Sequence, residues 1–187
     1  MELRQMKEKK KHMTLEEFEQ LPENVKAEFD GETVTFFSAP STYHQEISAN
    51  LERAFYEYLK ELPCKIFAAV QVKLFKNKNK FRIPDLLILC EKKKMSKNQI
   101  IGAPELIIEI VSPESIKRDY IEKLAEYNQA GVKEYWIVDP LSKKVTLYNL
   151  ETTENFLMIF EEDMTLHSLI FGEFSISLVD IFAEKLW

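Results

Sequence analysis

The sequence is poor in glycine and has no long apolar run. Its four glycines form no phosphate-binding cluster, so the dinucleotide- and nucleotide-loop motifs are absent. No stretch reaches about 18 consecutive apolar residues, the length that a membrane span needs. The charged segment at residues 1–7 has no apolar stretch behind it, as a secretory signal would have. We therefore expect a cytoplasmic protein without a membrane span.

Cysteine is also scarce, and the two present, Cys64 and Cys90, show no metal-ligand spacing. Both lie in apolar surroundings, where a free cysteine usually behaves as a small buried hydrophobe. The sequence has no Cys/His set with zinc spacing and no Gly-x-Ser-x-Gly nucleophile motif. We expect Cys64 and Cys90 to be reduced thiols in the core.

The net charge of -6 argues against a protein that coats nucleic acid. The positive charge is nevertheless concentrated in the middle of the chain, and a local basic patch can hold a phosphate backbone. The alternative is that these side chains are simply solvated loops and strand faces. The residues in question are Lys65, Lys73, Lys76, Lys78, Lys80, Arg82, Lys92, Lys93, Lys94 and Lys97.

The 187 residues fit one compact domain with a real core. Residues 1–13 are charged and lack periodicity, so we interpret them as a flexible basic lead-in to a single domain at 14–187. A capping box at Thr14 begins a short helix, and Asp30-Gly31 predicts a hairpin over residues 26–38.

The remaining local signals alternate between helix and strand. Ser41 is the expected N-cap of a long helix with an apolar stripe, and Gly131 is the expected C-cap of a later one. This order predicts one α/β (α+β) domain with a sheet of mixed strand directions. The predicted helices span residues 14–21, 41–62, 116–130 and 179–186, the last as a helix or turn, and the predicted strands span 65–75, 82–90, 105–111, 134–139, 145–150 and 156–161.

A carboxylate in an apolar strand is the most informative feature of the chain. Glu109 lies within the apolar run at residues 104–113, which is bounded by prolines. Because a buried unpaired carboxylate is prohibitively costly, Glu109 needs a cation, a proton or a partner. Asp85 similarly opens the apolar run at residues 86–90.

If these two strands are neighbours, Asp85 and Glu109 converge. Mg²⁺ or Mn²⁺ prefers such oxygen ligands and keeps several waters, and the backbone carbonyl of Ile110 is a plausible third ligand. Such a site can activate water and stabilise charge on a transferring phosphate. The alternative is that Asp85 is a turn residue and that Glu109 pairs with a lysine.

Three further side chains could support the site. Lys123 lies on the margin of the buried face of its helix, from which it could orient a water or offset phosphate charge; the alternative is a surface pair with Asp119. His44 and Glu46 lie in the first turns of the long helix and could contact phosphate or metal, although polar residues are normal there. Tyr135 and Trp136 are interpreted as core aromatics.

Taken together, these segments resemble the Uma-two family of restriction-endonuclease-like proteins. The resemblance covers roughly residues 14–186 and is carried by the segments 29–32, 39–44, 84–85, 102–113, 119–123, 127–132 and 134–140. It implies the PD-(D/E)xK nuclease fold, a mixed central sheet flanked by helices with the metal site on adjacent strands.

The resemblance also implies roles for individual residues. Asp85 and Glu109 would bind the metal, and Glu46 would correspond to an acidic residue of the first helix. The superfamily places a lysine two residues after the glutamate, where this chain has Val111; Lys123 on the following helix is the natural substitute. The resemblance further implies a homodimer.

The resulting hypothesis is an Mg²⁺- or Mn²⁺-dependent endonuclease that hydrolyses phosphodiester bonds in DNA. The alternatives are a catalytically inactive nuclease fold that binds nucleic acid, a protein-interaction module, and an enzyme acting on RNA or another phosphodiester. Fold-level analogy does not decide among them.

Overall fold

The computed structural model describes residues 9–22, 24–153 and 156–184. In this part of the chain, two six-stranded sheets and one two-stranded sheet are combined with four α-helices. The mixed α+β class predicted from the sequence is confirmed. None of the described helices is both long and apolar enough to cross a membrane.

The larger sheet contains the hydrophobic strands predicted from the sequence. Only β9 (Leu106–Ile110) and β10 (Glu134–Asp139) run parallel; the other neighbouring strands of this sheet are antiparallel. The mixed directions that the sequence predicted are therefore present. The strand order is β12 (Leu157–Glu161), β11 (Lys144–Asn149), β10 (Glu134–Asp139), β9 (Leu106–Ile110), β7 (Leu86–Leu89) and β4 (Lys65–Ala68).

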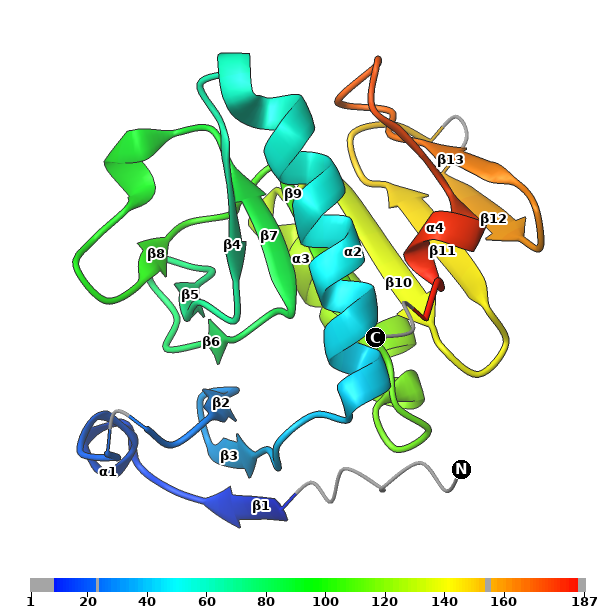
Figure 1. Cartoon of the computed structure of the whole chain (residues 1–187). Helices are drawn as coiled ribbons and strands as arrows, with labels where there is room; N and C mark the ends of the chain where they lie inside the picture. Colours follow the sequence, from blue (N-terminus) through cyan, green and yellow to red (C-terminus); the bar gives the residue numbers. More distant parts are fainter. Residues whose placement is uncertain (1–8, 23, 154–155, 185–187) are drawn as a thin grey trace.

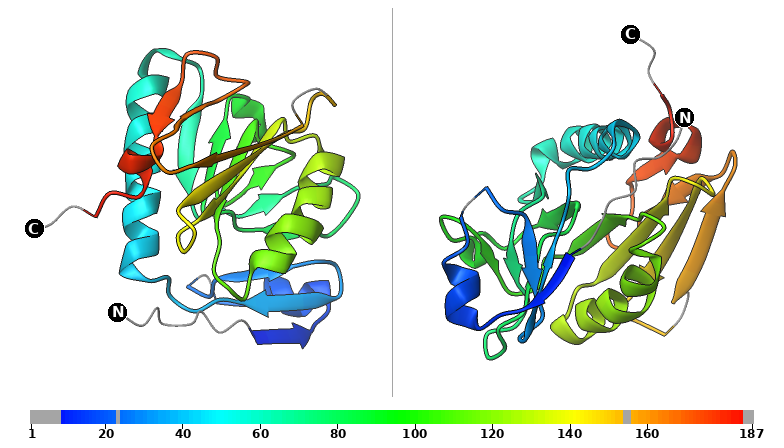
Figure 2. Two further views of the ribbon diagram at one scale, coloured as in Figure 1. Left: turned by 90° about the vertical axis from the view of Figure 1, so that its right-hand side faces the viewer. Right: turned by 90° about the horizontal axis from the view of Figure 1, so that it is seen from below.

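Two helices cover opposite faces of this sheet (Figures 1 and 2). The helix α2 (Thr42–Tyr58) packs Ile47, Leu51 and Phe55 into the core, as its apolar stripe predicted, and Ser41 caps its N-terminus. On the other face, a π-helical segment, η3 (Arg118–Lys123), continues into α3 (Leu124–Ala130). Gly131 ends α3 with a φ of 91°, which suits a residue without a side chain.

The second six-stranded sheet extends from β1 (Lys9–His12), β2 (Ala27–Phe29) and β3 (Thr33–Phe36) at the bottom of Figure 1 to β8 (Ile100–Ile101) on its left-hand side. The predicted Asp30 turn joins β2 and β3, and Thr14 forms the expected capping box of α1 (Leu15–Glu19). Phe18, Phe29 and Phe81 give this part a small core of its own. The strand order is β1 (Lys9–His12), β3 (Thr33–Phe36), β2 (Ala27–Phe29), β6 (Phe81–Arg82), β5 (Val72–Lys73) and β8 (Ile100–Ile101).

Several predicted boundaries are wrong. Lys9–His12 form β1, which pairs with β3, instead of part of a flexible lead-in; residues 1–8 lie outside the described residues. The predicted strand at 65–75 is divided between β4 and β5 because Ala69 adopts a left-handed φ of 51°. The predicted strand at 82–90 is divided between β6 and β7 around Pro84, which has no N–H for a ladder. The chain therefore crosses between the two sheets at these two points.

The C-terminal part adds elements that the sequence did not all predict. The short strands β13 (Thr165–His167) and β14 (Ser175–Ser177) pair with each other. They precede α4 (Leu178–Ile181), which lies where a helix or turn was expected. Phe174, Leu178 and Ile181 join the core beneath α2, so this segment completes the apolar layer on that face.

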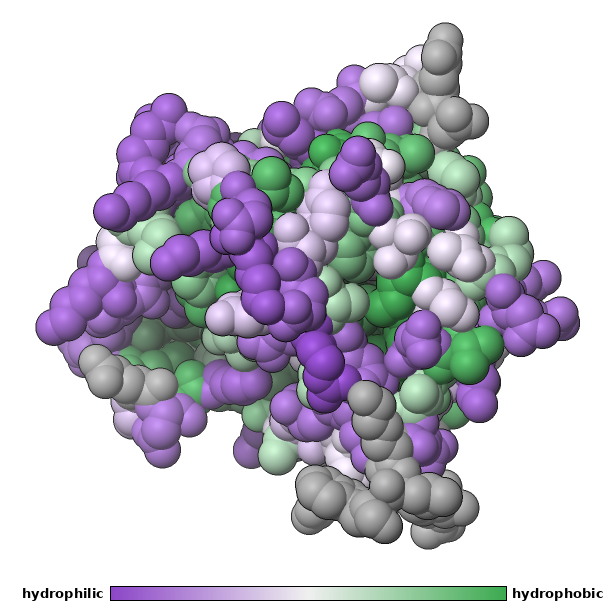
Figure 3. All heavy atoms as spheres, turned by 45° about the horizontal axis from the view of Figure 1, so that its top comes forward, coloured by the Kyte–Doolittle hydropathy of each residue, from purple (hydrophilic) through white to green (hydrophobic). Residues whose placement is uncertain are grey.

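The lysines around residue 93 lie on the molecular surface. Lys92, Lys93 and Lys97 are exposed beside the short 3-10 helix η2 (Lys92–Lys94), and hydrophilic side chains cover much of the left-hand side of Figure 3. Glu91 forms ion pairs of 2.6 Å with both Lys93 and Lys94. Binding of a phosphate backbone by this surface remains a prediction.

The prediction of two reduced thiols is wrong, because Cys64 and Cys90 form a disulfide. Cys64 directly precedes β4 and Cys90 directly follows β7, and the ladder pairs Lys65 with Leu89. The next position along this antiparallel pair therefore places the two cysteines opposite each other. Apolar context alone could not reveal this register.

We predict that the unreduced, denatured protein contains no titratable thiol and is 2 Da lighter than the reduced protein by mass spectrometry. Because the bond closes a loop across a sequence separation of 26 residues, Cys64→Ser should lower the free energy of unfolding by about 3 kcal/mol. Wild-type protein kept in reductant is the control. Two free thiols per unreduced chain would contradict the prediction.

Candidate metal and phosphodiester site

A pocket lies where the two sheets meet, next to the crossover points. It contains about 600 Å³ of empty space, part of it open to solvent. Its walls come from the hairpin β2–β3, the ends of β7 and β9, and the segment that follows β9. The lining residues are Lys26, Glu28, Phe37, Ser38, Pro40, His44, Ala69, Ile83, Asp85, Glu109, Ile110, Ser112, Ser115, Arg118, Asp119 and Lys123.

The two predicted metal ligands come from neighbouring strands. The strands β7 and β9 are antiparallel and pair Leu86 with Ile108. The next pair of positions places Asp85 opposite Glu109, and directly opposite residues of an antiparallel ladder project to the same face. Both side chains line the pocket. The structure thus brings Asp85 and Glu109 together.

Glu109 is buried and compensated by two donors. Its Oε1 accepts hydrogen bonds from Lys123 Nζ at 2.8 Å and from the Tyr127 hydroxyl at 2.6 Å. Burial raises the pKa of Glu109, and the neighbouring carboxylates Asp119 and Asp85 raise it further. Lys123 lowers the pKa, but it does not outweigh the other effects, and the pKa of Glu109 reaches about 8. In the metal-free protein, this group therefore binds a proton far more readily than an ordinary carboxyl.

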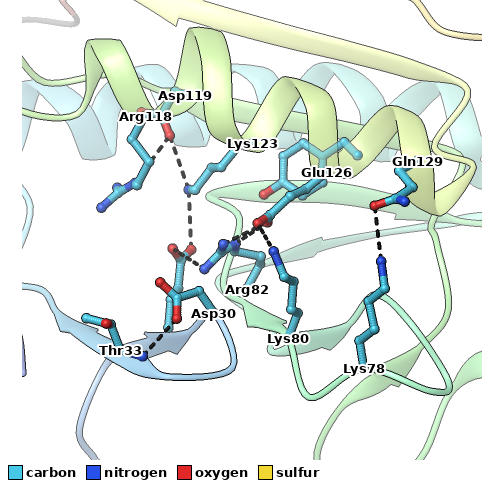
Figure 4. A network of polar contacts seen from close by, with 12 residues as sticks. Asp30, Thr33, Lys78, Lys80, Arg82, Arg118, Asp119, Lys123, Glu126 and Gln129 are labelled. Carbon is cyan, nitrogen blue, oxygen red and sulfur yellow. Dashed lines mark hydrogen bonds and ion pairs between the residues drawn. The ribbon is translucent and has the colours of Figure 1, made fainter. Parts of the chain in front are cut away.

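Lys123 lies among three carboxylates. Its Nζ is 2.8 Å from Glu109 Oε1 and 3.3 Å from both Glu28 Oε1 and Asp119 Oδ1. Figure 4 shows the pair of Lys123 with Asp119. The alternative of a surface pair is wrong, because both residues are only 2% exposed. Burial lowers the pKa of Lys123, but the three carboxylates outweigh burial and raise it. Lys123 is therefore a fixed ammonium at neutral pH.

Asp85 is held by α2 and by β9. Its Oδ2 accepts the N–H of Ile110 at 2.8 Å and lies 3.3 Å from His44 Nε2. Burial favours the neutral acid, but the bonds from His44 and Ile110 outweigh it and keep the pKa of Asp85 below its ordinary value. An ionised Asp85 thus faces the pocket, and the predicted residue His44 is its partner.

Glu46 is not brought to this site. It is half-buried on α2 and does not line the pocket. Glu28 of β2 is the acidic residue that the sequence analysis missed; it is 1% exposed and contacts Lys123. The sequence does contain a sign of this role, because Glu28, like Glu109, is a carboxylate between apolar residues. However, β2 has only three residues, which is too short for its alternating pattern to be recognised in the sequence.

Part of the predicted basic patch is ion-paired with Glu126, and Arg82 connects these contacts through Glu28 to those around Lys123 (Figure 4). Glu126 of α3 pairs with Arg82 at 2.7 Å and with Lys80 at 2.5 Å. These contacts fix the β6 segment to α3. Arg82 and Lys80 are therefore structural cations in this arrangement, and the interpretation as freely solvated side chains is wrong for them.

The residues present fit a magnesium-type ion. Four carboxylates and three permanently charged cations line the pocket. Within the described residues, no three side chains of His, Cys, Asp or Glu are grouped to hold a metal ion by themselves. Mg²⁺ commonly uses one or two carboxylates and completes its shell with water and substrate phosphate. Asp85 and Glu109 match that pattern, and Ile110, the predicted third ligand, also lines the pocket.

Comparisons with known proteins give a family and a fold. A family model named Uma2 and described as "Putative restriction endonuclease" matches residues 15–179. Among solved structures, one described as a "putative nuclease belonging to DUF820" from Anabaena variabilis ATCC 29413 superposes with a TM-score of 0.74 and 22% identity. The match covers 91% of this chain and 97% of that one, which shows a shared fold. No curated protein matches the chain.

We predict that Lys123→Met lowers the free energy of unfolding by about 3–5 kcal/mol, because it leaves three carboxylates without their shared buried cation. Chemical denaturation in metal-free buffer at pH 7 measures the change. Lys144→Met is the matched control, since Lys144 pairs with Glu161 but both side chains are 46% exposed. The control should cost no more than about 1 kcal/mol. Equal losses in the two variants would contradict the prediction.

We also predict that Glu109 makes the metal-free protein less stable as the pH rises. The pKa of Glu109 is raised from 4.5 to about 8, so between these pH values the folded state binds a proton that the unfolded state does not. Stability attributable to Glu109 should then fall by up to about 1.4 kcal/mol per pH unit.

Denaturation curves of wild type and Glu109→Gln from pH 5 to pH 8 test this. Because glutamine does not titrate, the variant should gain stability relative to wild type as the pH rises. A difference that is constant over this range would refute the assignment.

Proposed function

The chain belongs to the Uma2 family, and from this premise we propose that it is an Mg²⁺- or Mn²⁺-dependent nuclease that hydrolyses phosphodiester bonds in DNA. The observation that carries the proposal is the placement of Asp85 opposite Glu109, one position beyond the β7–β9 ladder, in one pocket with Lys123. Two carboxylates and an ammonium at one point are the groups that metal-assisted phosphoryl chemistry uses.

Asp85, Glu109 and the Ile110 carbonyl are the groups that would hold the ion. When bound, the ion supplies Lewis acidity and lowers the pKa of water. His44 keeps Asp85 ionised and oriented by its contact with Oδ2. The N–H of Ile110 binds the same oxygen, so the backbone of β9 and the helix α2 fix this carboxylate from two sides.

Lys123 performs the part that the superfamily gives to a lysine on the strand. Val111 occupies that strand position and is buried in the apolar cluster beneath α3, with no polar group to offer. Lys123 reaches Glu109 from η3 instead. Because its pKa is raised, it acts by donating hydrogen bonds to a water or a phosphate oxygen and by offsetting negative charge, and it does not abstract a proton at neutral pH.

The nature of the substrate, the oligomeric state and the cellular location are parts of the proposal that a shared fold does not determine. DNA as the substrate is supported by the exposed lysines beside η2, which can contact a phosphate backbone. Val111 also supports the competing hypothesis of an inactive nucleic-acid-binding or protein-interaction module. The homodimer and the cytoplasmic location stay predictions.

We predict that wild type nicks supercoiled plasmid at low salt with Mg²⁺ or Mn²⁺, and that Asp85→Asn and Glu109→Gln each reduce the rate at least 100-fold. Each substitution removes a charged ligand but preserves side-chain size, and circular dichroism checks the fold. Glu161→Gln is the control, because Glu161 of β12 is also ion-paired, with Lys144, but lies outside the pocket and is not a partner of the lysines beside η2; it should cleave at the wild-type rate.

Cleavage retained by both site variants would place the chemistry elsewhere. No cleavage by wild type, together with no Mg²⁺ or Mn²⁺ binding by calorimetry, would favour the inactive module.

A further inference from the structure

We propose that Glu28 is a positioning residue of this site, through which the smaller sheet holds Lys123 and the segment carrying Asp85 in one arrangement. The inference deepens the proposed nuclease function and rests on it. No motif in the sequence pointed to Glu28, and its role follows from where β2 places it.

The strand β2 directs Glu28 away from the core of its own sheet. Side chains alternate along a strand, and the neighbouring residues Ala27 and Phe29 both belong to the small apolar cluster beneath α1. Glu28 therefore projects to the opposite face, toward the pocket, which it lines. Phe29 anchors the strand by stacking on Phe18 at 5.1 Å between ring centroids, so the position of Glu28 is fixed by packing.

One oxygen of Glu28 joins two parts of the site. Its Oε1 accepts the backbone N–H of Ile83 at 3.0 Å and lies 3.3 Å from Lys123 Nζ. Ile83 precedes Pro84 and Asp85 at the crossover between the sheets. A displacement of Glu28 would thus move the segment of chain that leads into Asp85. It would also remove one of the three carboxylates that surround Lys123.

Stability alone does not account for a carboxylate at this position. A buried ion pair is often no more stabilising than well-packed apolar residues of similar volume. Glu28 Oε2 has no hydrogen-bond partner, and Arg82 Nη1 lies 3.8 Å away. Burial opposes ionisation, but Lys123, Arg82 and Arg118 outweigh it and lower the pKa of Glu28. A permanent charge with one incompletely bonded oxygen is costly, which points to a role at the adjoining site.

Glu28→Gln is the decisive variant. Glutamine can still accept the Ile83 N–H but no longer offers Lys123 a charge. We expect the maximal nicking rate to fall about 10–100-fold, because small errors in the placement of a reacting group have effects of this size. The plasmid concentration for half-maximal rate and the Mg²⁺ dependence should change less than threefold, because neither Asp85 nor Glu109 is altered.

Glu126→Gln is the matched control. Glu126 is also largely buried and ion-paired with Arg82, at 2.7 Å; it shares this cation with Glu28, but it does not line the pocket. A purely structural role of Glu28 predicts equal rate losses in the two variants. Equal losses, or an unchanged maximal rate in Glu28→Gln, would overturn the proposal.

A second measurement does not depend on activity. The buried ammonium of Lys123 should give a slowly exchanging ¹⁵N NMR signal, assigned by its loss in Lys123→Met. This signal should shift or broaden in Glu28→Gln and remain in place in Glu126→Gln. If wild type cleaves no plasmid but the signal responds only to Glu28, the nuclease function fails while the positioning of Lys123 stands. An unchanged signal in Glu28→Gln would refute the positioning.

Discussion

The buried ammonium of Lys123 is the interaction on which the arrangement of the site depends. It comes from η3, and the carboxylates around it come from β2, from β9 and from its own helix. Three elements that are far apart in the sequence, β2, β9 and η3, therefore share one buried charge. Each of these carboxylates would be costly to bury without a cation, so the contacts with Lys123 hold the three elements together. The same contacts act to lower the pKa values of Glu28 and Glu109, which line the pocket.

The division of the chain between two sheets explains why the pocket is where it is. Ala69 and Pro84 interrupt what would otherwise be two long strands, and the Ala69 N–H donates to the backbone oxygen of Asp85 at 3.1 Å. Asp85 thus lies at the edge of β7, where the ladder has ended and its side chain is free to face the pocket. Two residues further into the strand, Leu87 is fully buried in the apolar cluster beneath α3, so a carboxylate at that position could not face the pocket.

The features that the sequence predicted are those with a local cause. Caps at Thr14 and Ser41, the Asp30 turn and the apolar runs of β9 and β10 are written in neighbouring residues, and so is the conflict between Glu109 and its surroundings. The features it missed depend on register or on distant partners. The disulfide needs the alignment of β4 with β7, and the role of Glu28 needs two sheets to be in contact.

The excess of acid in the pocket links the stability of the protein to the chemistry we propose. Burial and the neighbouring carboxylates Asp119 and Asp85 raise the pKa of Glu109, so in the metal-free protein this group takes up a proton more readily than an ordinary carboxyl does. A divalent ion between Asp85 and Glu109 would supply the same compensation without a proton. Lys123 cannot do so alone, because it already serves three carboxylates. In the site that we propose, the burial and the crowding of acidic groups that raise the pKa of Glu109 would also favour the binding of a divalent cation.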